Sequence, residues 1–350
     1  MTLDELLKIT IERKASDLHL TTNLPPVTRV NGELSYIGDE KLTGADLELY
    51  AKEVLKDRYD SYRETGEFDL SYSALGIGRF RVNVFRQRGS DAIAFRVVTL
   101  KIPTLTELKL PSVVQELTTK QRGLILVTGP TGSGKSTTLA AMINEINANR
   151  SGHIITLEDP IEYLHKHNKC MINQREIGKD TDNYSNALRA ALREDPDVIL
   201  VGEMRDLETI SIAITAAETG HLVLSTLHTI GAAKTIDRII DVFPPYQQEQ
   251  IKMQLATVLQ GIVSQQLLPK INNDGRLAAL EILVMTPAIQ NLVREGKTFQ
   301  IESSVQTGSK YGMKSMDMSL AELYKKGLIS NDSAMTYAVD RDILSRLMNV

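Results

Sequence analysis

Residues 1–100 combine two helical patterns with short alternating segments. Residues 3–14 repeat apolar positions at helical spacing, and a second helix is predicted from Thr43, a good N-cap residue, to about residue 65. Strands are predicted at residues 16–20, 27–30, 33–36, 68–73, 78–88 and 92–99, where apolar and polar residues alternate. The dipeptide Asn31-Gly32 predicts a tight hairpin turn. We therefore expect a small α+β domain with an antiparallel sheet.

The pattern changes after residues 101–111, which contain two prolines and are predicted to form a linker and hinge. Beyond them, short apolar runs alternate with helical segments, as in sheets of buried parallel strands. These runs are residues 124–128, 154–157, 198–201 and 222–225. From Pro245 onward the chain is expected to be helical, with one helix over residues 247–268. We expect a doubly wound α/β domain over residues 112–350, with a helical subregion from about residue 245.

Composition narrows the classes of function. The formal net charge of −4, the aromatic content of 5% and the absence of tryptophan argue against tracking of nucleic-acid strands, because such grooves are basic and lined with aromatic rings. Cys170 is the only cysteine, which excludes an internal disulfide and a cysteine-rich zinc module. No apolar run approaches about 20 residues and the N-terminus lacks a basic start, so we expect a cytoplasmic protein that contacts membranes only through partners.

Residues 129–136 carry the strongest chemical signal. They read Gly-Pro-Thr-Gly-Ser-Gly-Lys-Ser between an apolar strand and a helical pattern, which is a complete P-loop in its required context. The glycines let backbone N–H groups face phosphates, and Lys135 supplies a cation. The Ser136 hydroxyl is predicted to bind Mg²⁺. Contacts with ATP are predicted for Gly129, Pro130, Thr131, Gly132, Ser133, Gly134, Lys135, Ser136 and Thr137.

Two other predicted strands end in carboxylates. Glu203 follows one of them, with Gly202 where an aspartate is usual, and we expect Glu203 to act on Mg²⁺ through water. Glu158 follows another strand and is a candidate general base for the attacking water. Asp159 and Glu162 are alternatives for that role. The two strand ends therefore predict hydrolysis in addition to nucleotide binding.

Two histidines bracket the predicted strand at residues 222–225. A histidine is more often a structural hydrogen-bonding group than a ligand, but these two flank one strand in the nucleotide-binding half of the chain. His228 follows the strand and is predicted to lie near the γ-phosphate, where it senses that group. His221 precedes the strand and is also predicted to contact the nucleotide. Metal binding is not expected, because no other cluster of ligands accompanies them.

Four arginines are candidates for stabilising phosphoryl charge, either within one chain or from a neighbouring subunit. They are Arg81 and Arg96 on predicted strands of the first domain, and Arg189 and Arg193 one helical turn apart before the strand at residues 198–201. Most surface arginines have no such function, so position alone leaves both interpretations open.

The motifs, in this order and spacing, resemble those of the secretion ATPase superfamily. They are Gly-Pro-Thr-Gly-Ser-Gly-Lys-Ser, Leu-Glu-Asp-Pro-Ile-Glu-Tyr, Leu-Val-Gly-Glu-Met-Arg-Asp and Thr-Gly-His with Thr-Leu-His, named there the Walker A loop, aspartate box, Walker B and histidine box. Over essentially the whole chain the resemblance is closest to the PilT family of type IV pilus retraction (twitching motility) ATPases. Residues 288–295 resemble that family's signature Ala-Ile-Arg-Asn-Leu-Ile-Arg-Glu, with Gln290 replacing an arginine and Val293 an isoleucine.

The resemblance implies a RecA-like P-loop ATPase core, a smaller N-terminal PAS-like α+β domain and a helical C-terminal region. It also implies a cytoplasmic homohexamer, peripheral to the inner face of the membrane, that uses ATP and Mg²⁺ and acts on an inner-membrane platform protein of the pilus machinery. In that ring Arg81 and Arg96 match arginines that contact phosphate, and Arg189 and Arg193 match the pair before the Walker B strand. Motion about the hinge between the domains would drive pilus retraction.

Three alternatives remain at this point. A pilus assembly or type II secretion ATPase usually carries an extra N-terminal domain and often a tetracysteine motif, which this sequence lacks. A hexameric nucleic-acid translocase shares the core but is disfavoured by composition. A nucleotide-gated scaffold without hydrolysis is disfavoured by the full set of carboxylates. The expected function is an Mg²⁺-dependent ATPase motor that disassembles pili.

Overall fold

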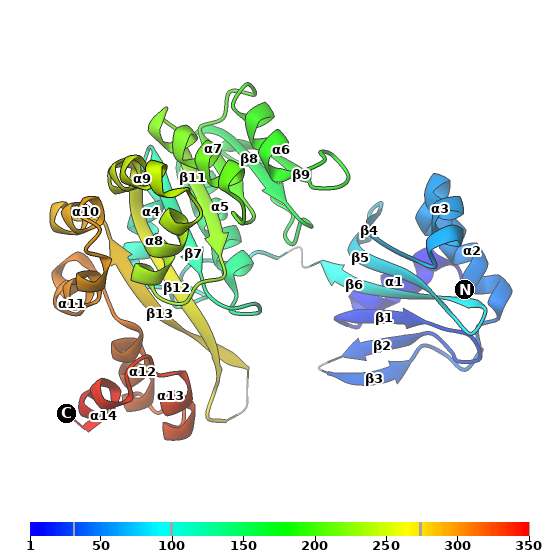
Figure 1. Ribbon diagram of the computed structural model, residues 1–350. Coiled ribbons are helices and arrows are strands. Elements are labelled where there is room, and N and C mark those ends of the chain that lie inside the picture. Colours follow the sequence, from blue (N-terminus) through cyan, green and yellow to red (C-terminus); the bar gives the residue numbers. More distant parts are fainter. Residues whose placement is uncertain (31, 99–100, 273–274, 350) are drawn as a thin grey trace. The chain divides into compact units, whose positions relative to one another are not determined.

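The structure, a computed structural model, describes residues 1–30, 32–98, 101–272 and 275–349. The chain forms two compact units, one of Met1–Lys101 with Glu162–Leu164 and one of Ile102–Ile161 with His165–Val350 (Figure 1). The predicted boundary at residue 100 and the turn residue Asn31 lie outside the described residues. The fold is the predicted α/β class, with an ATPase-type core of mixed, mainly parallel strands and a smaller α+β unit.

The first unit is an antiparallel sheet with helices on one face. Its elements are α1 (Leu3–Glu12), β1 (Asp17–Leu20), β2 (Val27–Val30), β3 (Glu33–Tyr36), α2 (Gly44–Leu55), α3 (Tyr59–Thr65), β4 (Glu67–Ala74), β5 (Gly78–Gln87) and β6 (Ser90–Val98). The sheet order is β3-β2-β1-β6-β5-β4. Apolar residues of the helices, such as Leu6 and Leu47, pack with Leu18, Val82 and Phe95 from alternate strand positions. The intervening strand positions therefore lie on the other face.

The local signals in this unit are largely confirmed. Thr43 caps α2 through a capping box with Asp46, as its residue type predicts. The predicted helix to residue 65 is interrupted, because Lys56 has a φ of 51° and ends α2. A short 3-10 turn, Lys56–Arg58, then leads into α3. The left-handed backbone at Lys56 breaks the helical hydrogen-bond ladder, which periodicity alone does not reveal.

The second unit contains a seven-stranded sheet in the order β13-β12-β7-β11-β10-β8-β9. Its elements up to the last strand are α4 (Ser112–Thr118), β7 (Gly123–Thr128), α5 (Lys135–Asn149), β8 (Gly152–Glu158), β9 (Cys170–Glu176), α6 (Tyr184–Ala191), β10 (Val198–Val201), α7 (Leu207–Glu218), β11 (Leu222–Leu227), α8 (Ala232–Asp241), α9 (Pro245–Val258), β12 (Leu259–Pro269) and β13 (Arg276–Val284). All paired strands are parallel except β13, which is antiparallel to β12. The predicted buried strands β7, β8, β10 and β11 are confirmed.

Helices cover both faces of this sheet (Figure 1). On one face Leu139 and Ile143 of α5 pack with Val127 of β7. On the other face α7, α8 and α9 pack against the same strands, for example Ile236 with Val201. The P-loop helix therefore lies on one face of the sheet, and helices α7 and α8 lie on the other. Residues at the ends of the strands can contact elements on either face.

The prediction of one helix over residues 247–268 is wrong. Helix α9 ends at Val258, and the next residues form strand β12, which lies between β13 and β7 in the sheet. Ile262 packs into the core on one face and Val263 into the core on the other. A strand that is buried on both faces shows no alternation, so its apolar run fits either period. The C-terminal region is therefore helical only after β13.

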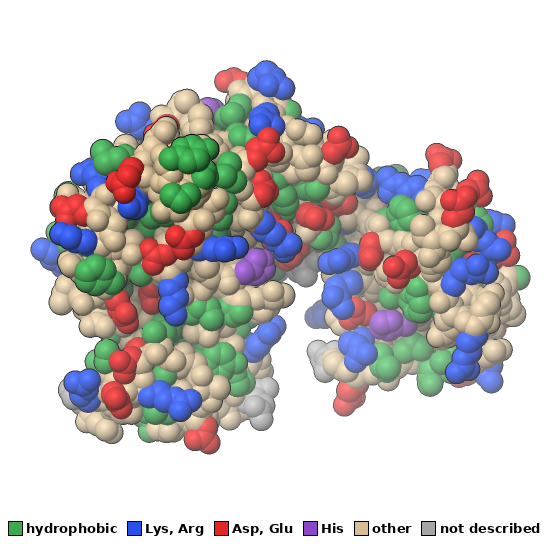
Figure 2. Space-filling view, viewed as in Figure 1, with side chains coloured by type: hydrophobic (Ala, Val, Ile, Leu, Met, Phe, Trp, Pro, Cys, Tyr) green, Lys and Arg blue, Asp and Glu red, His purple; other side chains and the backbone are tan. Residues whose placement is uncertain are grey.

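Helices α10 (Pro287–Arg294), α11 (Ile301–Thr307), α12 (Met316–Lys325), α13 (Asn331–Tyr337) and α14 (Arg341–Asn349) complete the second unit. The segment predicted as a linker packs partly into this unit, because Leu105 is buried with Val113 and Leu117. Charged side chains of both signs are scattered over the displayed surface (Figure 2). Within the described ranges, no helix combines the length and apolar character needed to span a membrane.

Candidate active site

Four adjacent strands of the second unit end at the same edge of the sheet, and each carries a predicted functional residue. Strand β7 leads into Gly129 of the P-loop, β11 into His228, β10 into Glu203, and β8 ends at Glu158. The order β7-β11-β10-β8 makes these strands neighbours. Ligands bind at the carboxyl ends of strands in open α/β sheets. Residues from four distant parts of the sequence are thus brought to one edge.

The P-loop has the backbone that its glycines predict. Gly129, Gly132 and Gly134 have φ values of 143°, 78° and 90°, a region that strains other residues. Gly129 also lies against strand β12, where an added Cβ would be 2.2 Å from the carbonyl oxygen of Gln265. At residue 129 the loop therefore combines a positive φ with no space for a side chain. Only glycine fits at residue 129.

Lys135 lies inside this loop. Its side chain is 8% exposed, and its Nζ donates to the carbonyl oxygens of Gly129 at 2.9 Å and Pro130 at 3.1 Å. Lys135 begins helix α5, and Ser136 and Thr137 follow in the first turn, whose N–H groups lie outside the helical ladder. The helix terminus adds partial positive charge. This arrangement fits a phosphate chain with its bound Mg²⁺.

Glu203 is held by two neighbours. Its Oε1 lies 2.6 Å from Nε of Arg205, and its Oε2 lies 3.3 Å from Nε2 of His228. The Glu203 side chain is 21% exposed and that of His228 42% exposed, so both stay accessible. The predicted carboxylate and the predicted sensor histidine are therefore in contact. They form one polar group beside the P-loop strand.

Glu158 is also fixed by hydrogen bonds. Its Oε1 accepts from Oγ1 of Thr156 at 2.6 Å and from Nε2 of Gln174, on β9, at 3.2 Å. Of the alternatives, Asp159 is exposed and adjoins a cis peptide bond to Pro160. Glu162 belongs to the segment grouped with the first unit. Glu158 is the carboxylate among these that the sheet itself positions.

Tyr184, at the start of α6, is a residue of this edge that sequence reasoning missed. Its pKa is raised by burial and then by the negative charges of Glu203, Asp159 and Glu158. A Cβ added at Gly202 would lie 2.8 Å from the Tyr184 hydroxyl. The phenol therefore occupies the space that an aspartate side chain at residue 202 would need. This contact gives a physical reason for glycine at that position.

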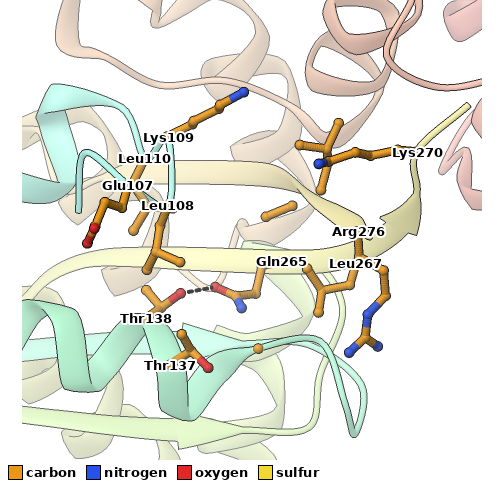
Figure 3. A pocket seen from close by; sticks show the side chains of 13 residues that line it. Glu107, Leu108, Lys109, Leu110, Thr137, Thr138, Gln265, Leu267, Lys270 and Arg276 are labelled. Atoms are coloured by element: carbon orange, nitrogen blue, oxygen red, sulfur yellow. Dashed lines mark hydrogen bonds between the residues drawn. The ribbon is translucent and has the colours of Figure 1, made fainter. Parts of the chain in front are cut away.

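Gln265 is a second residue that no sequence pattern singled out. It lies on β12, is 1% exposed, and its Nε2 donates to the carbonyl oxygen of Ser133 at 2.6 Å. Its Oε1 accepts from Oγ1 of Thr138, on α5, at 2.9 Å (Figure 3). Gln265 therefore joins strand β12 to the P-loop and to its helix. A glutamine inside an apolar run is no motif, so only the sheet order reveals this contact.

A cavity of about 350 Å³ lies beside the start of α5. Figure 3 shows Thr137 and Gln265 below it, Leu108 on one side and Arg276 with Leu267 on the other. Leucine side chains line it together with charged groups of both signs, from Glu107, Lys109, Lys270 and Arg276. Small-molecule sites combine apolar walls with polar groups that fix the orientation of the ligand. It adjoins the P-loop directly.

A second cavity, of about 380 Å³, lies on the α7 and α8 side of the same edge. Glu203, Arg205 and His228 line it together with Arg238 of α8. In the described part of the chain, no cluster of three or more His, Cys, Asp or Glu side chains has the form of a metal site. Mg²⁺ would therefore depend on few protein ligands and on phosphate oxygens, which is usual for this ion.

His221 lies at the end of its strand that is away from the P-loop. It precedes β11, and its Nδ1 lies 2.9 Å from the carbonyl oxygen of Ala216. Residue Leu222 pairs with Gly123, at the far end of β7 from the P-loop. Strands rise about 3.3 Å per residue, so roughly 20 Å separates His221 from Gly129. His221 therefore lies far from the P-loop of its own chain, and its predicted contact with nucleotide stays a prediction.

Three of the four predicted arginines lie apart from the P-loop of the same chain or outside its unit. Arg193 follows α6 and precedes β10, at the opposite edge of the sheet. Arg189 forms an ion pair with Glu208 at the start of α7. Arg81 and Arg96 oppose each other on β5 and β6 of the first unit, and Nε of Arg96 contacts Asp17 at 2.9 Å.

Three comparisons with known proteins agree. Residues 79–326 match the family described as "Type II/IV secretion system protein". The chain is 49% identical over 335 residues to "Type IV pilus retractation ATPase PilT" of Pseudomonas aeruginosa, covering 95% of this chain and 97% of that protein. It is 48% identical over 321 residues to "Twitching motility protein" of Neisseria gonorrhoeae, covering 91% and 86%.

A solved structure described as "Crystal Structure of the Pilus Retraction Motor PilT and Bound ADP" superposes with a TM-score of 0.92 at 50% identity. The superposition covers 99% of both chains. The likeness thus includes both units and the edge with the P-loop, Glu203 and His228. The family match, the identities and the coverage together show that this chain belongs to the Type II/IV secretion system protein family.

Proposed function

We propose that this chain is an Mg²⁺-dependent ATPase that drives retraction of type IV pili, with ATP as substrate. The observation that carries the proposal is the edge where the P-loop, His228, Glu203 and Glu158 end neighbouring strands. Binding alone would need only the P-loop, whereas hydrolysis needs a group that orients water and charge that stabilises the transferring phosphoryl group. The names of the two relatives, a pilus retraction ATPase and a twitching motility protein, support retraction of pili as opposed to their assembly.

Each side chain has a definite role in this proposal. The P-loop N–H groups and Lys135 bind the β- and γ-phosphates, and Ser136 with Glu203 holds the ion, Glu203 through water. Mg²⁺, when bound, neutralises phosphate charge and orients the γ-phosphate. Glu158 takes the proton of the attacking water, since its carboxylate is fixed by Thr156 and Gln174. His228 reports the state of the γ-phosphate to Glu203, which it contacts.

The cavity beside α5 would hold the base and ribose of the nucleotide. It begins at Thr137, which lies just beyond the P-loop serine, and its walls include Leu108 and Leu267. Leu108 belongs to the segment proposed as a hinge, so a nucleotide bound in this cavity would contact that segment. We propose residues 1–100 and 112–350 as the two functional domains, with residues 101–111 between them.

Three of the four arginines suit a homohexamer better than a monomer. Arg81 and Arg96 have no P-loop within their own unit, and Arg193 lies at the far edge of the sheet from the P-loop of its chain. A neighbouring subunit would bring such arginines to a nucleotide, as arginine fingers do in other ATPases. We propose a ring that works at the cytoplasmic face of the inner membrane on a platform protein of the pilus machinery.

The direct test is ATP turnover of the purified chain, measured as phosphate release, with light scattering for the oligomeric state. Lys135→Ala should lose nucleotide binding, and Glu203→Gln should retain binding but fall roughly 100-fold or more in turnover. The controls Lys169→Ala and Glu249→Gln change exposed residues of the same types. Removal of Mg²⁺ with a chelator should abolish turnover. Cells with either site variant should keep pili extended, and normal twitching would contradict the proposal.

A nucleic-acid translocase remains the alternative of another class. The displayed surface mixes Lys and Arg with Asp and Glu and has no continuous basic tract (Figure 2). Affinity for single-stranded DNA that falls steeply with salt would favour this alternative. Retained pilus retraction in a variant without turnover would instead favour a scaffold.

A further inference from the structure

Two consecutive residues of strand β12, Ser264 and Gln265, contact two different loops of the nucleotide edge. Side chains of successive strand residues point to opposite faces of a sheet. Ser264 pairs in register with Thr128, the last residue of β7, so Gln265 lies beside Gly129. Strand β12 therefore runs past the end of β7, with one polar side chain on each face.

On the face of α5, Gln265 holds the P-loop. Its amide makes two hydrogen bonds, to the Ser133 carbonyl at 2.6 Å and from the Thr138 hydroxyl at 2.9 Å. An added Cβ at Gly134 would lie 3.1 Å from Nε2 of Gln265. A buried amide that uses both its donor and its acceptor in this way has one favoured orientation. The loop backbone around Ser133 is thereby fixed relative to the sheet.

On the face of α8, Ser264 and Glu281 hold the turn that follows His228. The Ser264 hydroxyl accepts from N–H of Gly231 at 3.0 Å. Glu281 is the register partner of Ser264 on β13, and its Oε1 accepts from N–H of Ala232 at 2.6 Å. These are the first amides of α8, which lack partners in the helix and favour a negative charge.

Residue 281 is an unfavourable position for a carboxylate, because burial disfavours the charged form. Burial raises the pKa of Glu281, although hydrogen bonds from the backbone of Ala232 and Met316 oppose that shift. Met316 begins α12, so the carboxylate contacts the first residues of two helices. A titratable group at a position where burial opposes its charged form is more often retained for function than for stability.

We propose that Gln265, Ser264 and Glu281 are positioning residues that divide one task between the two faces of β12. Gln265 sets the P-loop for phosphate binding. Ser264 and Glu281 set the turn after His228, and through it the contact between His228 and Glu203. The first role governs affinity for nucleotide, and the second governs the rate of hydrolysis. This inference rests on the proposed ATPase function.

The test compares Gln265→Ala, Ser264→Ala and Glu281→Ala with the matched control Gln266→Ala. Gln266 is the next residue of β12, is 7% exposed and contacts the Tyr337 carbonyl at 3.4 Å instead of either loop. Nucleotide Kd, KM, kcat and melting temperature are measured for each. Gln265→Ala should raise Kd and KM about tenfold, and Ser264→Ala and Glu281→Ala should lower kcat about fivefold with Kd unchanged, the effect of one or two lost hydrogen bonds.

A merely structural role would make KM and kcat follow melting temperature in all four variants, and that result would overturn the proposal. Unchanged kcat in both Ser264→Ala and Glu281→Ala would also overturn it. Glu281→Gln, which keeps an acceptor oxygen, should restore part of kcat and serves if Glu281→Ala does not fold. If even Glu281→Gln fails to fold, Ser264→Ala decides the second face.

Hydrogen exchange separates this inference from the proposed function. In Ser264→Ala and Glu281→Ala, the amides of residues 229–235 should exchange faster, while those of the P-loop stay unchanged. Gln265→Ala should show the reverse pattern and weaker ADP binding. These readouts need no turnover, so an inactive parent chain would contradict the ATPase proposal alone. Equal exchange in all variants would contradict the positioning roles alone.

Discussion

The two sheets of this chain expose polar residues in different ways. The sheet of the first unit has helices on one face, so Arg81 and Arg96 stand on the uncovered face, opposite each other in register. The sheet of the second unit has helices on both faces, and its polar groups emerge at the strand ends. A substitution on an open sheet face removes charge without disturbing a core, whereas one at a covered edge also changes packing. The predictions below test this difference.

The largest effect is expected from Arg81→Ala combined with Arg96→Ala. If these arginines stabilise the transferring phosphoryl group of a neighbour, turnover should fall about 100-fold or more while nucleotide Kd changes little. The double change relieves like charges opposite each other in the sheet, but it also takes a partner from the buried Asp17, so we expect a modest net loss of stability. Phosphate release and fluorescent-nucleotide binding measure the two quantities. Arg88→Ala, at an exposed turn, is the control, and equal turnover in both would refute the role.

A smaller loss is expected at the covered edge from Gly202→Ala. The new methyl group would meet the Tyr184 hydroxyl at 2.8 Å and the Leu157 carbonyl at 3.1 Å, so the phenol has to move away from Glu203 and Glu158. Turnover should fall roughly tenfold, with an overpacking cost of about 1–3 kcal/mol. Adding Tyr184→Phe removes the nearer clash and should restore part of the stability. No recovery in the double variant would show that the backbone contact dominates.

Tyr62→Phe tests whether the core of the first unit can be weakened without loss of chemistry. The Tyr62 hydroxyl donates to Oδ1 of Asp91 at 2.7 Å, and both residues are buried. Removing the donor leaves a buried carboxylate without this partner, which costs about 1–3 kcal/mol. Chemical denaturation should show this loss, with turnover at 25 °C nearly unchanged. Tyr36→Phe, which changes an exposed ring, should have no effect on either.

The smallest effect is expected outside both sheets, at Glu322 of α12. Hydrogen bonds from Lys314 and Lys326 lower the pKa of Glu322 to about 2, from a usual 4.5. A lowered pKa in the folded chain means that the stabilisation is complete above pH 4.5 and is lost as the pH falls toward 2. At pH 7, Glu322→Gln should therefore lower the free energy of unfolding by less than about 1 kcal/mol, because Glu322 and its two lysines are partly exposed. The melting temperature should fall slightly.

The same melting experiment at lower pH checks the cause. The difference between the parent chain and Glu322→Gln should shrink from pH 4.5 downward and vanish near pH 2. A difference that stays constant over this range would assign the effect to packing. Glu249→Gln, which removes an exposed partner of Lys252, should give no measurable difference at any of these pH values.

Sequence patterns were sufficient where a strand has one buried face or a motif fixes the backbone. Alternation placed β4, β5 and β6, and the P-loop glycines gave the position of the phosphate site. The patterns failed for β12, because its apolar run is buried on both faces and fits a helix equally well. Strand β9 was missed because polar residues such as Asn173 and Gln174 interrupt its short apolar pattern at the sheet edge.

The candidate site was predictable to the extent that strand ends could be recognised. Glu158, Glu203 and His228 follow apolar runs, and the structure brings them to one edge. The same rule places His221 at the opposite edge, because it precedes its strand. Tyr184 and Gln265 were not predictable, since each lies within a regular element and reaches the site only through the order of strands. Their contacts depend on topology, which no local pattern contains.

The alternation of faces along strand β12 limits which changes of length this protein can accept during evolution. Deletion of a single residue before Ser264 would exchange the faces of all residues after it. The amide that holds the P-loop would then face α8, and the hydroxyl that holds the turn after His228 would face α5. A single insertion or deletion in β12 should therefore not be tolerated, even if the resulting run of residues is apolar and of suitable size. Only a pair of such changes that returns each later side chain to its original face should be.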